Sequence, residues 1–122
     1  MALGKEIGEF SLKSTSPYSA EEGGSLQLTY SGTAAGYGTV FGTITLRREP
    51  GAKTGPCTWR GLGFLDSGEV VLGVGQGTWE ELARYQCRTR MIISTSDGRT
   101  HASDGKLDLQ SRSLSGKMFD WS

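Results

Sequence analysis

Apolar and polar residues alternate along most of the chain, and turns rich in Gly, Pro, Ser or Asp interrupt the alternation at intervals of roughly ten residues. A period of two is the pattern of a β-strand that buries one face. It predicts eight strands, over Lys5–Ser14, Ser25–Thr33, Tyr37–Arg48, Cys57–Leu65, Glu69–Trp79, Tyr85–Thr95, Arg99–Leu109 and Gly116–Trp121. No apolar stripe of helical period continues beyond two turns, so the chain is predicted to be all-β.

The first hairpin signal is Asp66-Ser67-Gly68, which fits a three-residue loop that ends on a glycine in the left-handed conformation. This loop pairs Trp59 with Gly75 and gives the two strands distinct faces. One face carries Leu62, Phe64, Val70, Leu72 and Val74, and the other carries Trp59 and a row of glycines. We expect the apolar face to form the core and the glycine face to lie outside.

The next hairpin is predicted to turn over Glu80–Ala83, although Thr78–Arg84 also has a weak helical signal. This loop places Trp79 opposite Arg84 and Leu72 opposite Met91. The residues then directed inward are Cys87, Met91 and Ile93, and those directed outward are Arg88 and Arg90. A slip of one residue would bury both arginines, which argues against it.

A third hairpin signal, Ser96-Asp97-Gly98, pairs Ile93 with His101 and Met91 with Ser103. His101 therefore faces the interior in this register. Further inward-facing residues follow from the alternation, namely Phe10, Leu12, Leu26, Leu28, Tyr30, Val40, Ile44, Leu46, Leu107 and Leu109.

Eight consecutive antiparallel strands with one apolar face predict a single domain, residues 1–122, folded as an up-and-down β-barrel. Closure removes the unpaired strand edges of an open sheet. A two-sheet sandwich is the alternative. A barrel of eight strands has an interior that side chains just fill, or one that holds a small ligand.

Polar residues on the predicted interior face indicate where a ligand would bind. The candidate cavity residues are Tyr30, Arg60, Leu62, Leu72, Gln76, Cys87, Met91 and His101. Arg60 and Gln76 would form a polar wall in an apolar cavity, the usual composition of a small-molecule site; alternatively, Arg60 lies at the rim and extends into water. His101 is either a base in the cavity or a strand-end residue half-exposed beside its turn.

An outer cluster of Trp59, Arg88 and Arg90, laid over bare glycine backbone, is the candidate subunit interface. Tryptophan and arginine are enriched where interfaces are strongest. We therefore expect a homo-oligomer.

Composition narrows the function classes. Thirteen basic and thirteen acidic residues give a net charge of zero, whereas nucleic-acid-binding domains are usually strongly basic. The first ten residues have no apolar core of a signal peptide, and no apolar run reaches the length of a membrane span, so a cytoplasmic location is expected. With Cys57 outward and Cys87 inward, the two side chains point apart, so free thiols are expected. One histidine and two cysteines are too few for a usual zinc site, and no cofactor is expected.

The glycine-rich segments Gly36–Thr43, Gly61–Phe64 and Gly73–Thr78 resemble small bacterial barrels of uncharacterised function, which are similar in layout to the allene oxide cyclase-type barrel. That resemblance implies a barrel with an internal cavity. Allene oxide cyclases use an acidic residue and ordered water to guide ring closure, and no such acid can be placed in this chain. The Gly-x-Trp signature of lipocalins is replaced by Gly8-Glu9-Phe10.

Three functions are compatible with these features. The first is binding of a small, mainly apolar or amphipathic molecule inside the barrel, without chemistry; the polar head of an amphipathic ligand would lie near Arg60 and Gln76. The second is an isomerase or cyclase acting on an apolar substrate there. The third is a packed barrel that acts through a protein–protein surface.

Overall fold

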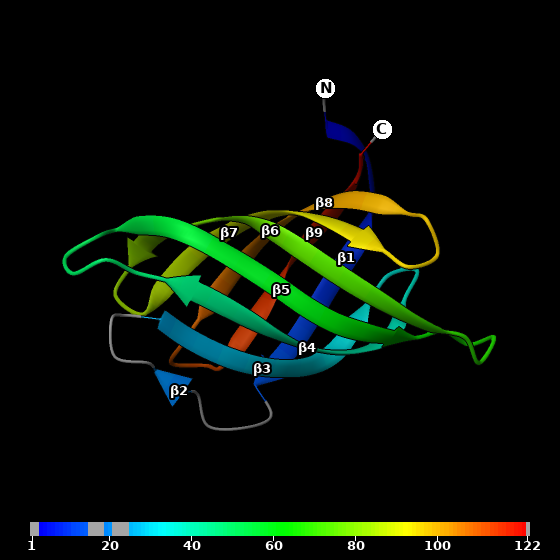
Figure 1. The fold of residues 1–122 in the computed structure, drawn as a ribbon, viewed down its shortest axis with the longest axis horizontal. Helices are drawn as coiled ribbons and strands as arrows, with labels where there is room; N and C mark the ends of the chain where they lie inside the picture. Colours follow the sequence, from blue (N-terminus) through cyan, green and yellow to red (C-terminus); the bar gives the residue numbers. More distant parts are fainter. Residues whose placement is uncertain (1–2, 15–18, 21–24, 122) are drawn as a thin grey trace.

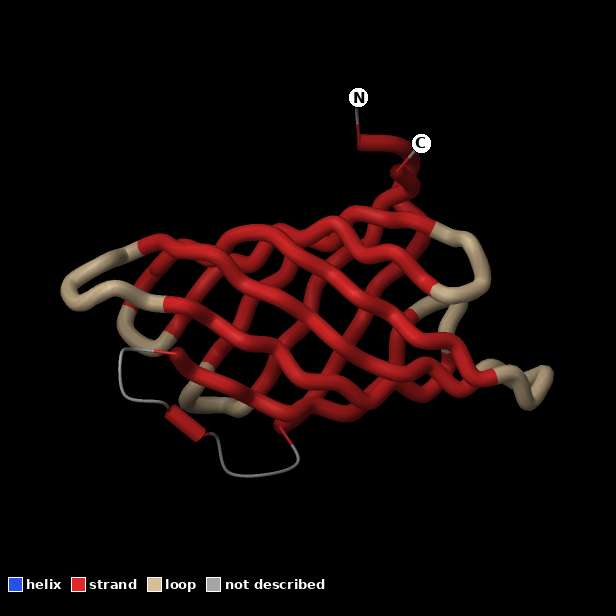
Figure 2. The backbone as a smooth tube through the Cα atoms, viewed as in Figure 1, coloured by secondary structure: helices blue, strands red, loops and turns tan. Residues whose placement is uncertain are grey.

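The fold is a closed barrel of eight antiparallel strands, drawn in Figure 1 from a computed structural model that describes residues 3–14, 19–20 and 25–121. The strands are β1 Leu3–Ser14, β2 Ser19–Ala20, β3 Ser25–Ala34, β4 Gly38–Arg47, β5 Thr54–Phe64, β6 Val70–Ala83, β7 Gln86–Thr95, β8 Thr100–Asp108 and β9 Ser113–Trp121. Figure 2 shows strands and connecting turns, and the described residues contain no helix. The predicted all-β barrel is confirmed, and the sandwich is not formed.

Closure depends on β1, which pairs with both β3 and β9. All other long strands pair with their neighbours in sequence, while the two-residue strand β2 adds to β3. The turns at 35–37, 65–69 and 96–99 lie together at one end, here called the His101 end, at the right of Figure 1. The turns at 48–53, 84–85 and 109–112 lie at the opposite end, here called the Cys87 end.

The core draws side chains from all eight barrel strands, as the alternating pattern predicts. Leu12, Tyr30, Ile44, Leu107 and Leu114 are among the least exposed residues. All the apolar residues predicted to face inward from β1, β3 and β4, together with Leu107 of β8 and the adjoining Leu109, belong to this core or pack against it. Across the described part of the chain there is no helix with the length and apolar character of a membrane span.

The β5–β6 hairpin has the predicted pairing but the opposite orientation. Trp59 pairs with Gly75 as expected, and the turn closes through the Leu65 amide donating to the Glu69 carbonyl at 3.0 Å, with Gly68 at φ 91°. However, Trp59 is buried. The apolar residues expected in the core, Leu62, Phe64, Val70, Leu72 and Val74, are each 40–51% exposed. The expected faces are therefore wrong.

The predicted β6–β7 connection is also wrong, in a way that matches the exchanged faces. β6 continues to Ala83, and the chain reverses over two residues, Arg84 and Tyr85, of which Tyr85 has a φ of 65°. Trp79 consequently pairs with Thr89 instead of Arg84, a shift of five residues. A shift by an odd number exchanges the faces of a strand, because side chains alternate with a period of two.

Burial of the largest side chains explains why the chain adopts this orientation. Trp59 and Trp79 both turn inward, and their rings remove more apolar surface from water than Leu or Val would. The indole of Trp59 needs space, which Gly61 on the same strand and Gly42 on β4 supply. A Cβ atom at Gly42 would lie 2.3 Å from Cζ2 of Trp59.

Arg88 and Arg90 lie on the outer surface as predicted, but without Trp59. The Arg88 guanidinium donates two hydrogen bonds to the Asp104 carboxylate, at 2.9 and 2.7 Å, and Arg90 forms an ion pair with Glu80 at 3.2 Å. The predicted Trp59–Arg88–Arg90 cluster does not exist, because the tryptophan points into the barrel. Carboxylates on neighbouring strands neutralise both arginines.

Candidate functional site

The barrel encloses a cavity of about 70 Å³ that opens toward the His101 end. Most of its wall is apolar, formed by inward-facing side chains of several strands and by the glycine face of β5 and β6. The lining residues include Leu12, Val40, Trp59, Gly61, Gly63, Val71, Gly73, Met91, Ile93, Leu114 and Met118. The polar side chains in the wall come from Tyr37, Thr95, His101 and Ser103. The interior is thus largely filled, with one small space against a few polar groups.

His101 reaches the cavity from β8 and is only 4% exposed. Its Nδ1 atom is hydrogen-bonded to the hydroxyl of Tyr37 at 3.2 Å, and the two ring centroids are 5.4 Å apart. Burial, and secondarily the positive charge of Arg99, lower the pKa of His101 below its usual 6.5. The imidazole is therefore neutral at pH 7, with one ring nitrogen able to donate a hydrogen bond and the other able to accept one.

Two charged residues, Arg99 and Asp97, lie next to the Tyr37–His101 pair at the mouth of the barrel. The Arg99 guanidinium lies 4.0 Å from the centroid of the Tyr37 ring and donates to the Gly36 carbonyl at 3.1 Å. Arg99 also pairs with Asp97 at 2.7 Å, and its hydrogen bonds lower the pKa of that carboxyl to about 2. These contacts tie the turns at 35–37 and 96–99 together across the mouth of the barrel.

Ser103 supplies a buried hydroxyl that is unpaired within the described part of the chain. The residue is 5% exposed and lines the cavity, and its Oγ has no hydrogen-bond partner among the described residues. Two other buried hydroxyls in the described part of the chain, those of Tyr30 and Thr89, also lack partners, but they do not line this cavity. An unpaired buried hydroxyl costs stability, on the order of 1–3 kcal/mol.

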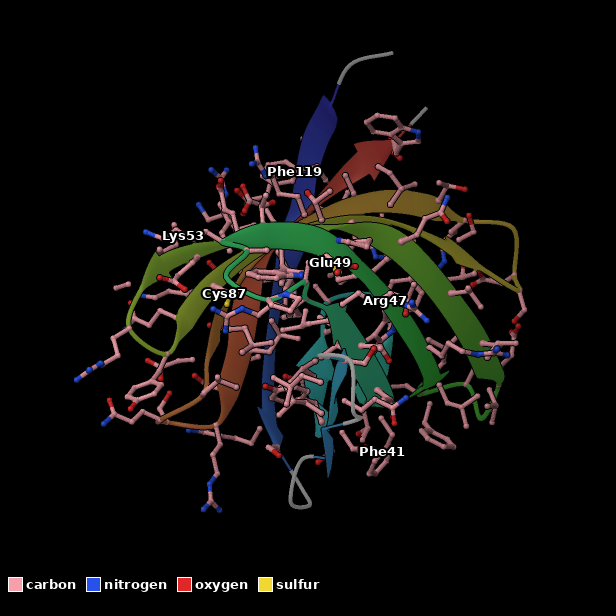
Figure 3. The ribbon with its side chains drawn as sticks, turned by 60° about the vertical axis from the view of Figure 1, so that its left-hand side comes forward. Phe41, Arg47, Glu49, Lys53, Cys87 and Phe119 are labelled. Atoms are coloured by element: carbon pink, nitrogen blue, oxygen red, sulfur yellow. The ribbon has the colours of Figure 1, made fainter. Side chains whose placement is uncertain are left out.

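The Cys87 end has a wider, open hollow of about 570 Å³. Its wall includes Leu26, Trp79 and Cys87, with Arg48 and Glu81 at the edge. Figure 3 views this end and shows the sulfur of Cys87 within the ring of strands. Burial, together with the charge of Glu81, raises the pKa of the Cys87 thiol, while Arg48 opposes the shift.

Tyr30 lies near the Cys87 end, as a member of the core. It is completely buried, and burial raises the pKa of its hydroxyl to about 12, with smaller contributions from Cys87 and Asp108. The tyrosine is therefore neutral at physiological pH.

The structure brings together only some of the predicted cavity residues. His101 and Met91 line the 70 Å³ cavity, whereas Tyr30 and Cys87 lie toward the other end. The faces of β5 and β6 are the reverse of the predicted ones, which leaves three candidates exposed on the outer surface: Arg60, Leu72 and Gln76. Leu62 only borders the cavity, and its side chain is 40% exposed. The predicted polar wall of Arg60 and Gln76 does not exist.

Two site residues are not revealed by the sequence pattern. Tyr37 falls in a predicted strand but not on its interior face, because the turn that contains Gly36 and Gly38, with φ of 80° and 70°, interrupts the alternation. Ser103 is present in the predicted register as the partner of Met91, and that pairing is confirmed. What the pattern does not reveal is that its hydroxyl is left without a partner among the described residues.

Cys57 is buried and faces the interior, so its predicted outward orientation is wrong, although both cysteines are free as predicted. Within the described residues, no group of three or more His, Cys, Asp or Glu side chains is placed to hold a metal ion.

Comparisons of the chain with protein-family models, with curated proteins and with solved structures give no match.

Proposed function

We propose that the barrel binds a small, neutral, mainly apolar molecule in the cavity at the His101 end. The observation that carries this proposal is the hydroxyl of Ser103, which is buried, without a partner among the described residues, and part of the wall of an apolar space. Burying a polar group without a partner is unfavourable, so a ligand that hydrogen-bonds to Ser103 recovers part of that cost. An apolar wall with a few convergent polar groups is the usual design of a small-molecule site.

The cavity also limits the shape and charge of the ligand. A space of about 70 Å³ is smaller than the roughly 150 Å³ of a cavity known to accommodate benzene, so it accepts a slender group or the end of a longer molecule that extends through the mouth. The neutral His101 offers no charge to an anion. A carbonyl or hydroxyl group on a short apolar chain fits these limits.

Methionine methyl groups provide a direct test. Two of the methionines, Met91 and Met118, line the cavity. With ¹³C-methyl-labelled methionine, titration with 2-butanone is expected to shift the Met91 and Met118 signals. Unchanged Met91 and Met118 signals at saturating probe would refute binding in this cavity.

A matched probe and a matched variant separate the hydrogen bond from simple filling of space. 2-Methyl-1-butene replaces the carbonyl oxygen of 2-butanone with a methylene group. Ser103→Ala should weaken 2-butanone binding by roughly tenfold, the effect of about 1.4 kcal/mol, and leave 2-methyl-1-butene unaffected. Thr89→Val removes a buried hydroxyl outside the cavity, also without a partner among the described residues, and should change neither affinity.

A second function, proton-transfer catalysis on the bound molecule, is favoured by one observation: His101 is held neutral in the same cavity by burial and is oriented by Tyr37. A neutral imidazole can take a proton from the carbon beside a carbonyl group and return it, which is the elementary step of an isomerase. In D₂O, the wild type should then exchange the α-protons of 2-butanone for deuterium, and His101→Gln should abolish the exchange. Binding without exchange would leave the protein a binding module.

A further inference from the structure

The outer surface of β4, β5 and β6 carries a continuous apolar face, referred to below as the β4–β6 face. It consists of Phe41, Leu62, Phe64, Val70, Leu72 and Val74, each 40–51% exposed. Cross-strand pairing makes them neighbours: Leu62 lies between Phe41 and Leu72, and Phe64 lies opposite Val70. The Phe41 and Phe64 rings pack edge to face with centroids 5.8 Å apart. Figure 3 shows Phe41 on the outer side of the barrel.

The rim of this face is polar and nearly uncharged. The residues paired or hydrogen-bonded with its members across the strands are Ser31, Thr39, Arg60, Ser94 and Ser96, and Arg60 is the single charge among them. An apolar centre with few charges inside a polar rim is the anatomy of a protein–protein interface. Arg88 and Arg90, by contrast, sit in an ion-pair network with Glu80 and Asp104.

We propose that the β4–β6 face is the contact between two copies of this chain. At 40–51% exposure, six residues of this size present roughly 500 Å² of apolar surface. Two copies would bury about twice that area before the rim is counted, and the rim brings the total to the roughly 1,200–2,000 Å² of a stable interface. The area is therefore sufficient for a symmetric dimer, in which the same patch serves both partners.

Charge and shape favour a second copy over other occupants. The chain has a net charge of zero, so two copies do not repel each other at long range. A membrane surface attracts clusters of basic residues, whereas the rim of this face has one arginine, Arg60, and adjoins a turn that contains Asp66 and Glu69. The face lies in the middle of a closed sheet, which offers no free edge to an added strand, but two such sheets can pack face to face.

The test is sedimentation velocity of the wild type and two variants up to about 0.5 mM, a range that detects affinities from nanomolar to millimolar. The wild type should sediment with twice the 13.1 kDa of one chain. Leu72→Lys on β6 and Phe41→Ser on β4 should each weaken dimerisation by at least ~100-fold. Leu82→Lys is the matched control, because Leu82 is 52% exposed on β6 but outside the face. Circular dichroism and thermal midpoints verify that each variant folds.

Several outcomes would overturn the proposal. A wild type that remains monomeric at the highest concentration would refute the dimer. A dimer that persists in both face variants would place the interface elsewhere, as would a dimer that dissociates in high salt, because an apolar contact is not screened. The wild type could also co-sediment with phosphatidylcholine–phosphatidylserine vesicles, and Leu72→Lys could abolish this binding. The β4–β6 face would then bind a membrane surface and not a second copy of the chain.

Discussion

A Cβ atom at Gly61 would lie 2.7 Å from Cζ2 of Trp59, so the indole of Trp59 occupies the space that any side chain at position 61 would need. Gly61 pairs across the strands with Gly73, where the surroundings differ. There, a Cβ atom would meet only Ile93 at 3.7 Å and Thr95 at 3.8 Å, which are ordinary contact distances. Two glycines of one cross-strand pair thus have different physical roles.

This difference predicts opposite effects of the same substitution. Gly61→Ala should destabilise the protein by about 1–3 kcal/mol, because Trp59 and the Phe41 carbonyl oxygen must move. Gly73→Ala should be neutral or stabilise by up to roughly 1 kcal/mol, since alanine restricts the unfolded chain and fits the native space. Urea unfolding of both variants measures the difference; equal losses would mean that Trp59 does not occupy the glycine face.

The fold could be predicted because turn chemistry and alternation agree over most of the chain. The turns closed by Gly68 and Gly98 have the predicted glycine conformation, and the pairing of Ile93 with His101 is confirmed. The orientation of β5 and β6 could not be predicted in the same way. Both of their faces contain apolar residues, so the choice depends on how much volume Trp59 and Trp79 require inside a closed barrel, which is a property of the whole fold.

The candidate site is only partly predictable for a related reason. Met91 and His101 follow from the register, but the same reasoning places Arg60 and Gln76 on the wrong face. The apolar residues that alternation assigns to the core instead form the β4–β6 face. Such failures of a local rule are expected at functional surfaces, which agrees with the dimer contact proposed for this face.

Buried hydroxyls without partners predict that two substitutions stabilise the protein. Ser103→Ala and Thr89→Val each remove an oxygen that has no partner among the described residues. Each variant should gain about 1 kcal/mol in the free energy of unfolding, since the unfolded state alone hydrates the hydroxyl. Their thermal midpoints in the absence of ligand provide the measurement, and a loss of stability in both would show that these hydroxyls are satisfied in solution.

The two thiols should differ in reactivity. Cys57 is 1% exposed, and burial raises its pKa to about 11, whereas Cys87 is half-buried at the wall of the open hollow. A disulfide-exchange reagent should find two thiols per unfolded, unreduced chain. In the native protein Cys87 should react first, and Cys87→Ser should remove that faster phase. A first phase that survives this substitution would place Cys57 in contact with solvent.

Stability should depend on pH through His101, the one histidine of the chain. Burial lowers its pKa in the folded state below the 6.5 of an exposed imidazole, so the unfolded chain binds the proton first. The stabilisation is fully present above pH 6.5 and is lost as the pH falls toward the folded-state pKa. The carboxyls of Asp97, Asp104 and Asp108, whose pKa values are lowered from 3.8, titrate below this window.

Urea unfolding between pH 7.5 and pH 5 should therefore show a decline in the stability of the wild type that is absent in His101→Phe. The ring-proton resonance of His101 should titrate with a midpoint below 6.5. An equal decline in both proteins would show that stability does not depend on protonation of His101. A midpoint above 6.5 would show that the folded protein favours the charged imidazole. Either result would contradict a buried, neutral His101 in the cavity.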